Sequence, residues 1–274
     1  TYKLLMKYAP IIDLTEAIFG NERTFSGRVF FEDAFLADGQ TDVLMEKGTP
    51  CILSTPKPTT FQHYLVQSKD DIRQLNHYNS PAAIRGNKLY WHKSGKNWQQ
   101  TDQEEIREHA TQYTEITPVK PNTKFIGRIR FENLSDEELG ALLYALDLPE
   151  GCYHKLGMGK PLGLGTIHIT ARLYLSDRKQ RYTNLFAEWN NDRPESENIS
   201  LFKKTFETYV LAEIGEATKE SLWEIHRLQE LECMLNYKKG LERQMKNVYM
   251  ELKEFRNRPA LPRPVFVLPK PSEV

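Results

Sequence analysis

Hydrophobic and polar residues alternate along three segments of the chain, and this alternation predicts β-strands. Across residues 125–132, Phe125 and the other apolar odd-numbered residues share one face of a half-buried strand. Across residues 166–175, the odd-numbered residues are apolar and are expected to face inward, whereas the even-numbered ones are polar or aromatic. A shorter alternating segment at residues 27–34 predicts another strand.

Three further segments have features of helices. Ser135 and Glu138 form a capping box, in which each side chain bonds the backbone N–H of the other residue, and leucines follow at helical intervals up to Leu146. This pattern predicts a helix of about three turns. A short helix that ends at a glycine is predicted at residues 13–20. From Leu201 onward, the apolar spacing favours a helical hairpin over a short coiled coil.

The order of strand, capped helix, glycine-rich loop and strand predicts a β-α-β unit of the ferredoxin-like or RNA-recognition type. The fold class is therefore α+β. We expect this core over residues 1–182, with an insertion at about 38–118. A helical extension follows at residues 183–258, and five prolines mark a non-helical tail at residues 259–274.

The composition is that of a folded protein without net charge. A chain of 274 residues allows about two domains, and its 37 basic and 37 acidic side chains cancel, which excludes a global attraction to nucleic acid. The charge is nevertheless uneven, because residues 155–182 contain six basic side chains and one acidic side chain. A site for a polyanion is therefore expected to be local.

Other features of the composition point to the cytoplasm. Hydrophobic residues make up 39% of the chain, a value typical of globular proteins, so no membrane partner is expected. The three cysteines are scattered and form no C-x-x-C pair, which argues against a disulfide framework or a zinc site. The chain begins at Thr1 without the features of a signal peptide, and we expect it to be a segment of a longer protein.

Four glycines fall within nine residues, at positions 157, 159, 163 and 165. Each costs about 0.5–1 kcal/mol of backbone entropy relative to Ala, and close approach of the backbone to a phosphate is one reason to keep them. A simple bulged turn is the alternative explanation. The spacing matches neither a Walker A loop nor a dinucleotide-binding fingerprint.

Candidate RNA-binding residues gather in this loop and in an earlier proline-rich segment. Prolines on both sides of Lys57 favour an extended backbone that presents a lysine and several hydroxyl groups. His63 and His92 have aromatic neighbours and are placed either to stack on unpaired bases or to lie in the core. The candidates are Lys155, Gly157, Met158, Gly159, Lys160, Pro161, Gly163, Gly165 and Arg172, together with Lys57, Thr59 and His63.

Acidic residues near the start of the chain are the candidates for catalysis. A metal-dependent nuclease needs two or three carboxylates to converge, and Asp13, Asp33 and Asp38 lie near glycines in this region. Capping or surface exposure is the competing explanation, and Asp33 is placed to cap a turn or to pair with Arg28. The histidines form no zinc-hydrolase pattern, so we assign no metal ligand and no catalytic residue.

Five separate blocks of the sequence resemble one known family. They are D-L-T-E-A-I-F-G at 13–20, G-R-V-F-F-E-D-A at 27–34, P-K-P-T-T-F-Q-H-Y-L at 56–65, K-L-Y-W-H at 88–92, and the glycine loop that ends with G-L-G at 163–165. In order and spacing, these blocks resemble the RAMP superfamily, the repeat-associated proteins of CRISPR effector complexes. The pattern is most similar to the backbone domains of type III systems, including the single-chain giant RAMP effectors.

The resemblance implies a function guided by RNA. RAMP domains have a ferredoxin-like core, assemble along a CRISPR guide RNA and hold its backbone with a glycine-rich loop, which corresponds here to residues 157–165. They also insert a thumb-like hairpin that kinks the duplex of guide and target. The implied partners are the guide RNA, the target RNA, neighbouring RAMP domains or subunits, and an accessory protein. The resemblance implies no cofactor for this segment and is compatible with a divalent metal in the complex.

The chain departs from the family pattern at its start. Family domains begin with a strand and a helix upstream of the Phe-Gly block, and active members cut target RNA with an aspartate on a nearby loop. Here only nine residues precede the segment that begins at Pro10 and contains this block at 13–20, so we expect the cutting aspartate to lie outside this segment or to be absent. The resemblance implies a guide-RNA-binding module for antiviral defence, with an endoribonuclease domain acting through Asp residues as the alternative.

Overall fold

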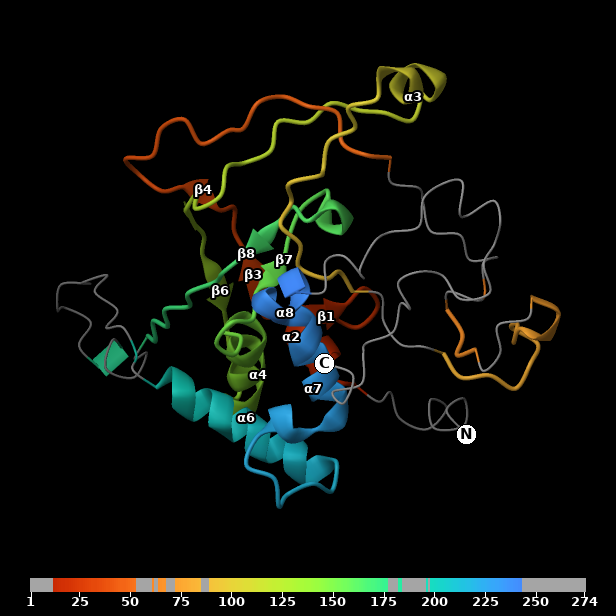
Figure 1. Cartoon of the computed structure of the whole chain (residues 1–274). Coiled ribbons are helices and arrows are strands. Elements are labelled where there is room, and N and C mark those ends of the chain that lie inside the picture. Colours follow the sequence, from red (N-terminus) through yellow and green to blue (C-terminus); the bar gives the residue numbers. More distant parts are fainter. Residues whose placement is uncertain are drawn as a thin grey trace. The chain divides into compact units, whose positions relative to one another are not determined.

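The structure is a computed structural model, which describes residues 12–52, 61, 64–67, 72–84, 89–176, 182–183, 196 and 198–242. The described chain is mixed α+β, with helices and small antiparallel strand pairs (Figure 1). It divides into two compact units: residues 1–44, 119–147 and 170–222 form the first, and residues 45–118, 148–169 and 223–274 form the second. The boundaries predicted at residues 182 and 258 stay predictions, and the proline-rich tail lies outside the described residues.

The first unit combines short strands with amphipathic helices. Its elements are α2 (Leu14–Phe19), β1 (Gly20–Asn21), β2 (Phe25–Ser26), β3 (Val29–Phe31), β4 (Phe35–Leu36), β5 (Phe125–Ile126), β6 (Ile129–Phe131), α4 (Asp136–Leu146) and α6 (Ile199–Glu213). The strands pair antiparallel as β1 with β2, β3 with β6 and β4 with β5. In the β3–β6 pair, Val29 lies opposite Phe131.

The second unit is built around one hairpin and several short helices. Its elements are η2 (Ile72–Gln74), α3 (Gln103–Glu108), β7 (His154–Lys155), η3 (Lys160–Leu162), β8 (Thr166–Ile167), α7 (His226–Leu235) and α8 (Tyr237–Glu242); η4 (Leu222–Glu224) spans the division between the units. β7 pairs antiparallel with β8. Within the described residues, no helix is long and apolar enough to cross a membrane.

Helix α4 begins with the capping box predicted from the sequence. Ser135 Oγ accepts a hydrogen bond from the backbone N–H of Glu138 at 3.3 Å, and Glu138 Oε2 accepts one from the backbone N–H of Ser135 at 2.8 Å. This arrangement satisfies two N–H groups that have no partner within the helix. Helix α2 is confirmed in the same way: Asp13 Oδ1 accepts from the backbone N–H of Glu16 at 2.7 Å.

Arg28 joins both of these helices to the strands. Its guanidinium pairs with Glu138 Oε1 and donates to the carbonyl oxygens of Ala17 and Asn133. Arg28 is therefore not the partner of Asp33, which was one alternative for that aspartate. Burial alone would raise the pKa of Glu138, but the hydrogen bond from Arg28, the backbone N–H of Ser135 and the charge of Arg28 lower it.

The core of the first unit lies between its helices and the β3–β6 pair. Ile18, Val29 and Leu142 form one buried cluster, and a second one contains Leu139, Leu143 and Leu173. Leu173 belongs to the alternating segment 166–175, where burial alternates as predicted. Only Thr166–Ile167 of that segment pairs as a regular strand, so the side-chain alternation is confirmed but the long strand is not.

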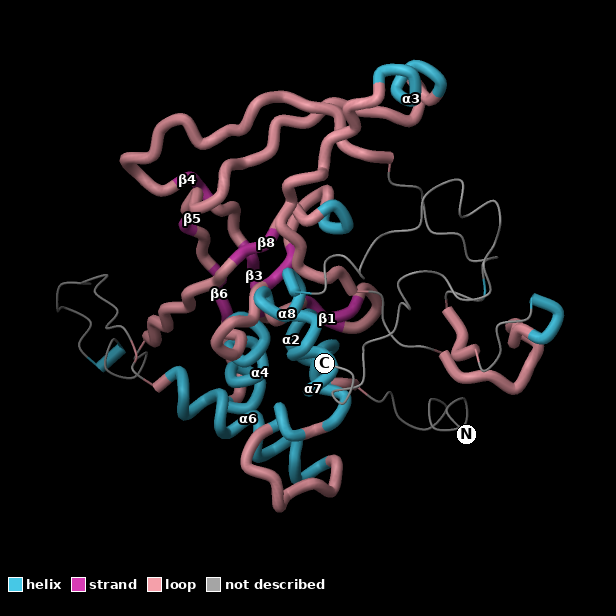
Figure 2. The backbone as a smooth tube through the Cα atoms, in the orientation of Figure 1, coloured by secondary structure: helices cyan, strands magenta, loops and turns pink. Residues whose placement is uncertain are grey.

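The paired strands of the first unit form a two-stranded ribbon that runs through β3–β6 and then β4–β5 (Figure 2). The sequence places Phe125 with Ile129 and Phe131 on one face of a half-buried strand, but Phe125 is 51% exposed in β5, whereas Ile129 and Phe131 are half-buried in β6. The reason is that Phe125 belongs to the β4–β5 part of the ribbon, and neither buried cluster includes a residue of β4 or β5.

Helices α4 and α6 cross at Gly140 with almost no space between them. A Cβ atom at residue 140 would lie 2.1 Å from the carbonyl oxygen of Phe202 and 2.8 Å from Cβ of Phe206. The backbone of α6 therefore packs directly on α4. Helix α6 confirms the helical region predicted from Leu201. The apolar positions spaced at helical intervals beyond Leu241, namely Met245, Val248, Leu252 and Phe255, lie outside the described residues.

We expect that replacing Arg28 with Met destabilises the protein by about 2–3 kcal/mol, because Glu138 and two carbonyl groups lose their donor together. Arg128→Met is the matched control, since Arg128 is 75% exposed and lies 3.9 Å from Glu32. Its effect on the free energy of unfolding should stay within about 0.5 kcal/mol. Urea unfolding followed by circular dichroism measures both, and equal losses would contradict the role of Arg28.

We also expect Gly140→Ala to destabilise the protein by about 1–3 kcal/mol through overpacking against α6. Ala for Gly inside a helix ordinarily stabilises by about 1 kcal/mol, so the sign of the change is the test. Thr208→Ala, at an exposed position of α6, is the control and should leave stability unchanged or slightly higher. A rise in melting temperature for Gly140→Ala would show that the two helices do not touch here.

Candidate anion-binding site in the glycine-rich loop

The β7–β8 hairpin positions the glycine-rich loop. Lys155 lies opposite Thr166 in the strand pair, and the N–H of Leu156 donates to the carbonyl oxygen of Gly165 at 2.8 Å. Between these ends, the loop contains the short helix η3, which begins after Gly159 and ends at Gly163. The structure thereby brings the predicted residues from 155 to 165 together in one loop of the second unit.

The four glycines of the loop all have positive φ angles. At Gly165, a Cβ atom would lie 1.9 Å from the carbonyl oxygen of Leu156, so only glycine fits. At Gly157, no atom lies within 4 Å of a Cβ position, although its φ is +77°. Turn geometry therefore explains the glycines, as the alternative of a bulged turn proposes, and it also determines which way the loop amides point.

Four successive amide N–H groups remain available at the start of this loop. Within the described residues, no hydrogen bond from the backbone N–H of Gly157, Met158, Gly159 or Lys160 is present. Left-handed glycines on both sides of Met158 alternate the backbone conformation, and such alternation makes successive N–H groups converge into a concave anion-binding nest. The loop therefore offers donors to an anion.

Two lysines donate to carbonyl oxygens of the loop itself. Lys155 Nζ donates to Leu164 O at 3.1 Å, and Lys160 Nζ donates to Gly157 O at 2.6 Å. Lys160 Nζ also lies 5.9 Å from the centre of the Tyr90 ring, within the range of a cation–π contact. These bonds hold positive charge beside the free amide groups.

Lys93 is a third cation at this loop, and the sequence analysis did not identify it. A Cβ atom at Gly163 would lie 3.0 Å from Cβ of Lys93, which shows how closely the two segments pack. Burial lowers the pKa of Lys93 to about 8. Burial and the charge of Lys93 together lower the pKa of Lys155 to about 8. A bound anion would relieve this repulsion.

His92 contacts residues of the β7–β8 hairpin region and is fully buried. Its Nδ1 is 3.0 Å from Thr166 Oγ1, and its Nε2 is 3.1 Å from the carbonyl oxygen of Tyr153. Burial, followed by the charge of Lys155, lowers the pKa of His92 to about 4, so the ring is neutral at pH 7. Of the two interpretations of His92, the structure supports the core residue, because a buried ring cannot stack on a base.

The other candidates for RNA binding and catalysis lie elsewhere in the chain. Arg172 is exposed and belongs to the first unit, while Lys57, Thr59 and His63 lie outside the described residues. Asp13 caps helix α2, Asp33 is exposed between β3 and β4, and Asp38 is exposed in a turn. The competing explanation of capping or exposure therefore describes each of the three aspartates.

Two further features carry no assigned ligand. On α3, ligand atoms of Glu105, Glu108 and His109 lie within 4.8 Å of one another, and the sequence analysis did not single out this group.

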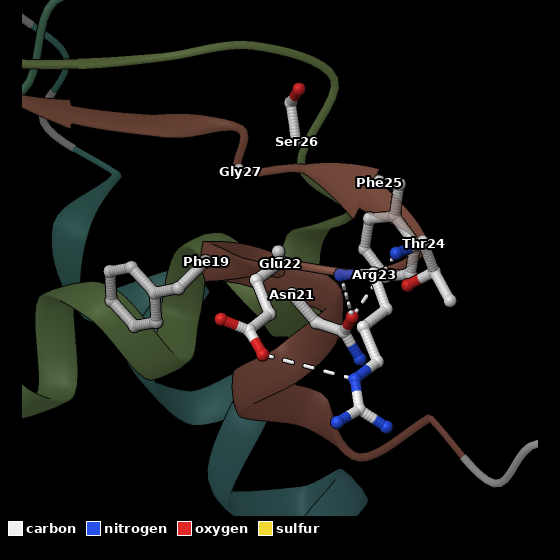
Figure 3. A pocket seen from close by; sticks show the side chains of 9 residues that line it. Phe19, Asn21, Glu22, Arg23, Thr24, Phe25, Ser26 and Gly27 are labelled. Carbon is white, nitrogen blue, oxygen red and sulfur yellow. Dashed lines mark hydrogen bonds and ion pairs between the residues drawn. The ribbon is translucent and has the colours of Figure 1, made fainter.

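Figure 3 shows a hollow at the β1–β2 hairpin, in which Asn21 Oδ1 accepts from the backbone N–H groups of Arg23 and Thr24. The side-chain amide oxygen of Asn21 at that hollow therefore already accepts hydrogen bonds from within the hairpin.

Comparison of the chain with protein-family models gives no match, and comparison with curated proteins gives no relative.

Proposed function

We propose that this chain is a guide-RNA-binding module of an RNA-targeting type III CRISPR effector and that its glycine-rich loop holds the guide backbone. The observation that carries the proposal is the row of four available amide groups from Gly157 to Lys160, with lysine ammonium groups beside it. The sequence resemblance to RAMP proteins assigns guide binding to the same loop.

Phosphate is the ligand group that suits this loop best. Backbone N–H groups and ammonium groups are donors, and a phosphodiester offers negatively charged acceptor oxygens without a competing donor. Contacts to phosphate carry no sequence information, so the loop is expected to hold guides of any sequence. The side chain of Met158 is 77% exposed beside the amides and is available for contact with a sugar or a base.

The ribbon of the first unit supports a second part of the proposal, the shaping of the guide–target duplex. Phe35 and Ile126 face each other across the ribbon and are 71% and 69% exposed, and Phe31 is 62% exposed. Exposed apolar side chains of this size insert between base steps and kink a duplex in other nucleic-acid-binding proteins. We assign this ribbon the role of the thumb-like hairpin that the family resemblance implies.

A ferredoxin-like RAMP core is part of the same proposal and rests on the order of elements. Strand β6, capped helix α4 and the β7–β8 hairpin with its glycine loop follow one another along the chain in the predicted order, while β6 pairs with β3 and β7 pairs with β8 in separate two-stranded sheets. We place the complex in the cytoplasm, with the target RNA, neighbouring RAMP domains and an accessory protein as further partners. Any divalent metal belongs to the assembled complex.

The proposal predicts that the lysines of the loop contribute to RNA affinity in a salt-dependent way. Changing Lys155 and Lys160 together to Ala should reduce the slope of log K against log salt by about 1.4, and Lys160→Ala alone by about 0.7. Lys96→Ala, an exposed lysine near the loop, is the control. Fluorescence anisotropy with a single-stranded RNA measures affinity at several salt concentrations. Unchanged binding by the double variant would refute the proposal.

The chain is proposed to position RNA without cutting it, and the alternative is an endoribonuclease that acts through aspartates. Asp13→Ala, Asp33→Ala and Asp38→Ala are each expected to leave single-turnover cleavage by the full effector within about threefold. Asp13→Ser preserves the helix cap and controls for loss of stability in the first variant. A rate loss of about 10²-fold or more at unchanged guide binding would establish the alternative.

A further inference from the structure

A cavity of about 400 Å³ lies in the second unit, where the residues before β7 meet the start of α8. Two backbone hydrogen bonds join these segments: the N–H of Tyr153 donates to Leu235 O at 3.0 Å, and the N–H of Tyr237 donates to Gly151 O at 2.9 Å. Cavities that bind small ligands have volumes of about 300–1,000 Å³. The cavity is therefore large enough for such a ligand, and backbone bonds hold its two walls together.

Two half-buried tyrosine rings, those of Tyr153 and Tyr237, line the cavity. Their centroids are 5.6 Å apart, and the fully buried ring of His92 lies 6.2 Å from the first and 5.7 Å from the second. The exposed ring of His168 lies 5.7 Å from Tyr153. Aromatic side chains held in place at a cavity are surfaces on which unpaired bases stack.

Donor groups line the same cavity. Lys238 and Lys239 are both part of its wall, and neither ammonium group forms an ion pair or a hydrogen bond within the part of the chain that the structure describes. Asn236 Oδ1 accepts from the backbone N–H of Lys239 at 3.0 Å, while its Nδ2 has no acceptor among the same residues. The cavity thus offers two cations and an amide donor beside its aromatic rings.

Glu242 adds an acceptor to this wall. In the described chain, its carboxylate forms no ion pair with Lys238 or Lys239, so the cations and the anion do not neutralise one another by direct contact. An ionised carboxylate accepts hydrogen bonds from ribose hydroxyl groups and from the amino groups of bases. A ligand that suits the whole cavity therefore has an aromatic ring, an anionic group and hydrogen-bond donors.

We infer that this cavity binds one unpaired nucleotide, whose base packs against the two tyrosine rings and whose phosphate contacts the two lysines. A nucleotide combines the three kinds of group that the wall complements. The inference rests on the proposed function for the source of the nucleotide, which is a residue of an RNA strand. A free nucleoside monophosphate has the same chemistry, and the experiment separates the two sources.

The position of the cavity along the chain supports RNA as the source. Tyr153 immediately precedes β7, the strand that leads into the glycine-rich loop. The loop offers backbone donors for phosphate, whereas the cavity offers aromatic side chains for a base. The two sites are therefore complementary parts of one RNA-binding region.

The experiment measures binding of adenosine 5′-monophosphate by calorimetry and of a short single-stranded RNA by anisotropy, both with the full chain. Tyr237→Leu should lower both affinities about tenfold, because it removes a stacking surface. Tyr237→Phe keeps the ring and should bind like the parent chain. Adenosine and inorganic phosphate, which each carry part of the nucleotide, should bind at least about tenfold more weakly than the monophosphate.

Two further variants test the polar groups. Changing Lys238 and Lys239 together to Ala should reduce the salt slope of RNA binding by about 1.4, whereas Lys96→Ala, the control, should leave it unchanged. Asn236→Asp keeps an acceptor for the N–H of Lys239 but replaces the Nδ2 donor with a charged oxygen. It should lower affinity for the monophosphate about tenfold.

The outcomes separate the inference from the proposed function, and a circular-dichroism melt identifies variants that lose their fold. If Tyr237→Leu unfolds, the lysine pair and Asn236→Asp carry the test. If the folded variants bind both probes like the parent chain while Lys160→Ala weakens RNA binding, the inference is wrong and the proposed function stands.

The two probes also identify the source of the nucleotide. Loss of RNA binding in the cavity variants, without measurable binding of the monophosphate, supports the inference with RNA as the source. Binding of the monophosphate alone, lost in the same variants, supports it with a free nucleotide as the source and contradicts the proposed function. If the parent chain binds neither probe, both are wrong.

Discussion

The hydrogen bonds of the Arg28 guanidinium are the constraint on which the first unit depends. They reach Ala17, Asn133 and Glu138, and the last two lie 105 and 110 residues away from Arg28 along the chain. A guanidinium has five N–H donors in one plane, so it can serve several acceptors at once, which the single ammonium group of lysine does less well. Glu138 serves two purposes, since one oxygen caps α4 and the other pairs with Arg28.

Much of the local structure was predictable, because short-range rules determine it. The Ser135 cap and the inward side of residues 166–175 follow from residues a few positions apart, and both are found in the structure. The partner strands do not follow from such rules, since β3 pairs with β6 across about a hundred residues of sequence. The burial of Phe125 was misjudged for this reason, and the contact of Gly140 with α6 had no local signal.

The same difference between local and long-range contacts applies to the residues of the candidate site. The glycines and Lys155 and Lys160 are neighbours in sequence, so their grouping was visible before the structure was known. Lys93 was missed because only tertiary packing brings it to the loop. For His92, the sequence allowed both a core position and base stacking, and its complete burial decides between them. Asp13 caps α2, and Asp38 lies in a turn. These roles depend on where helices and loops begin and end, and sequence patterns locate such boundaries only to within a few residues.

Each unit consists of three chain segments, and segments of the two units alternate along the sequence. The first unit needs residues 170–222 to complete the packing of α4 on α6, and the second needs residues beyond 223 to add α7 and α8. During synthesis, the first unit therefore cannot close until α6 has left the ribosome, and the second cannot close until α7 and α8 have. Contacts between such distant segments make folding slow, since a long loop must be ordered before its ends gain any stabilisation. A chain that folds in this order exposes its apolar strands until the late segments arrive, and exposed strand edges of this kind favour aggregation over folding.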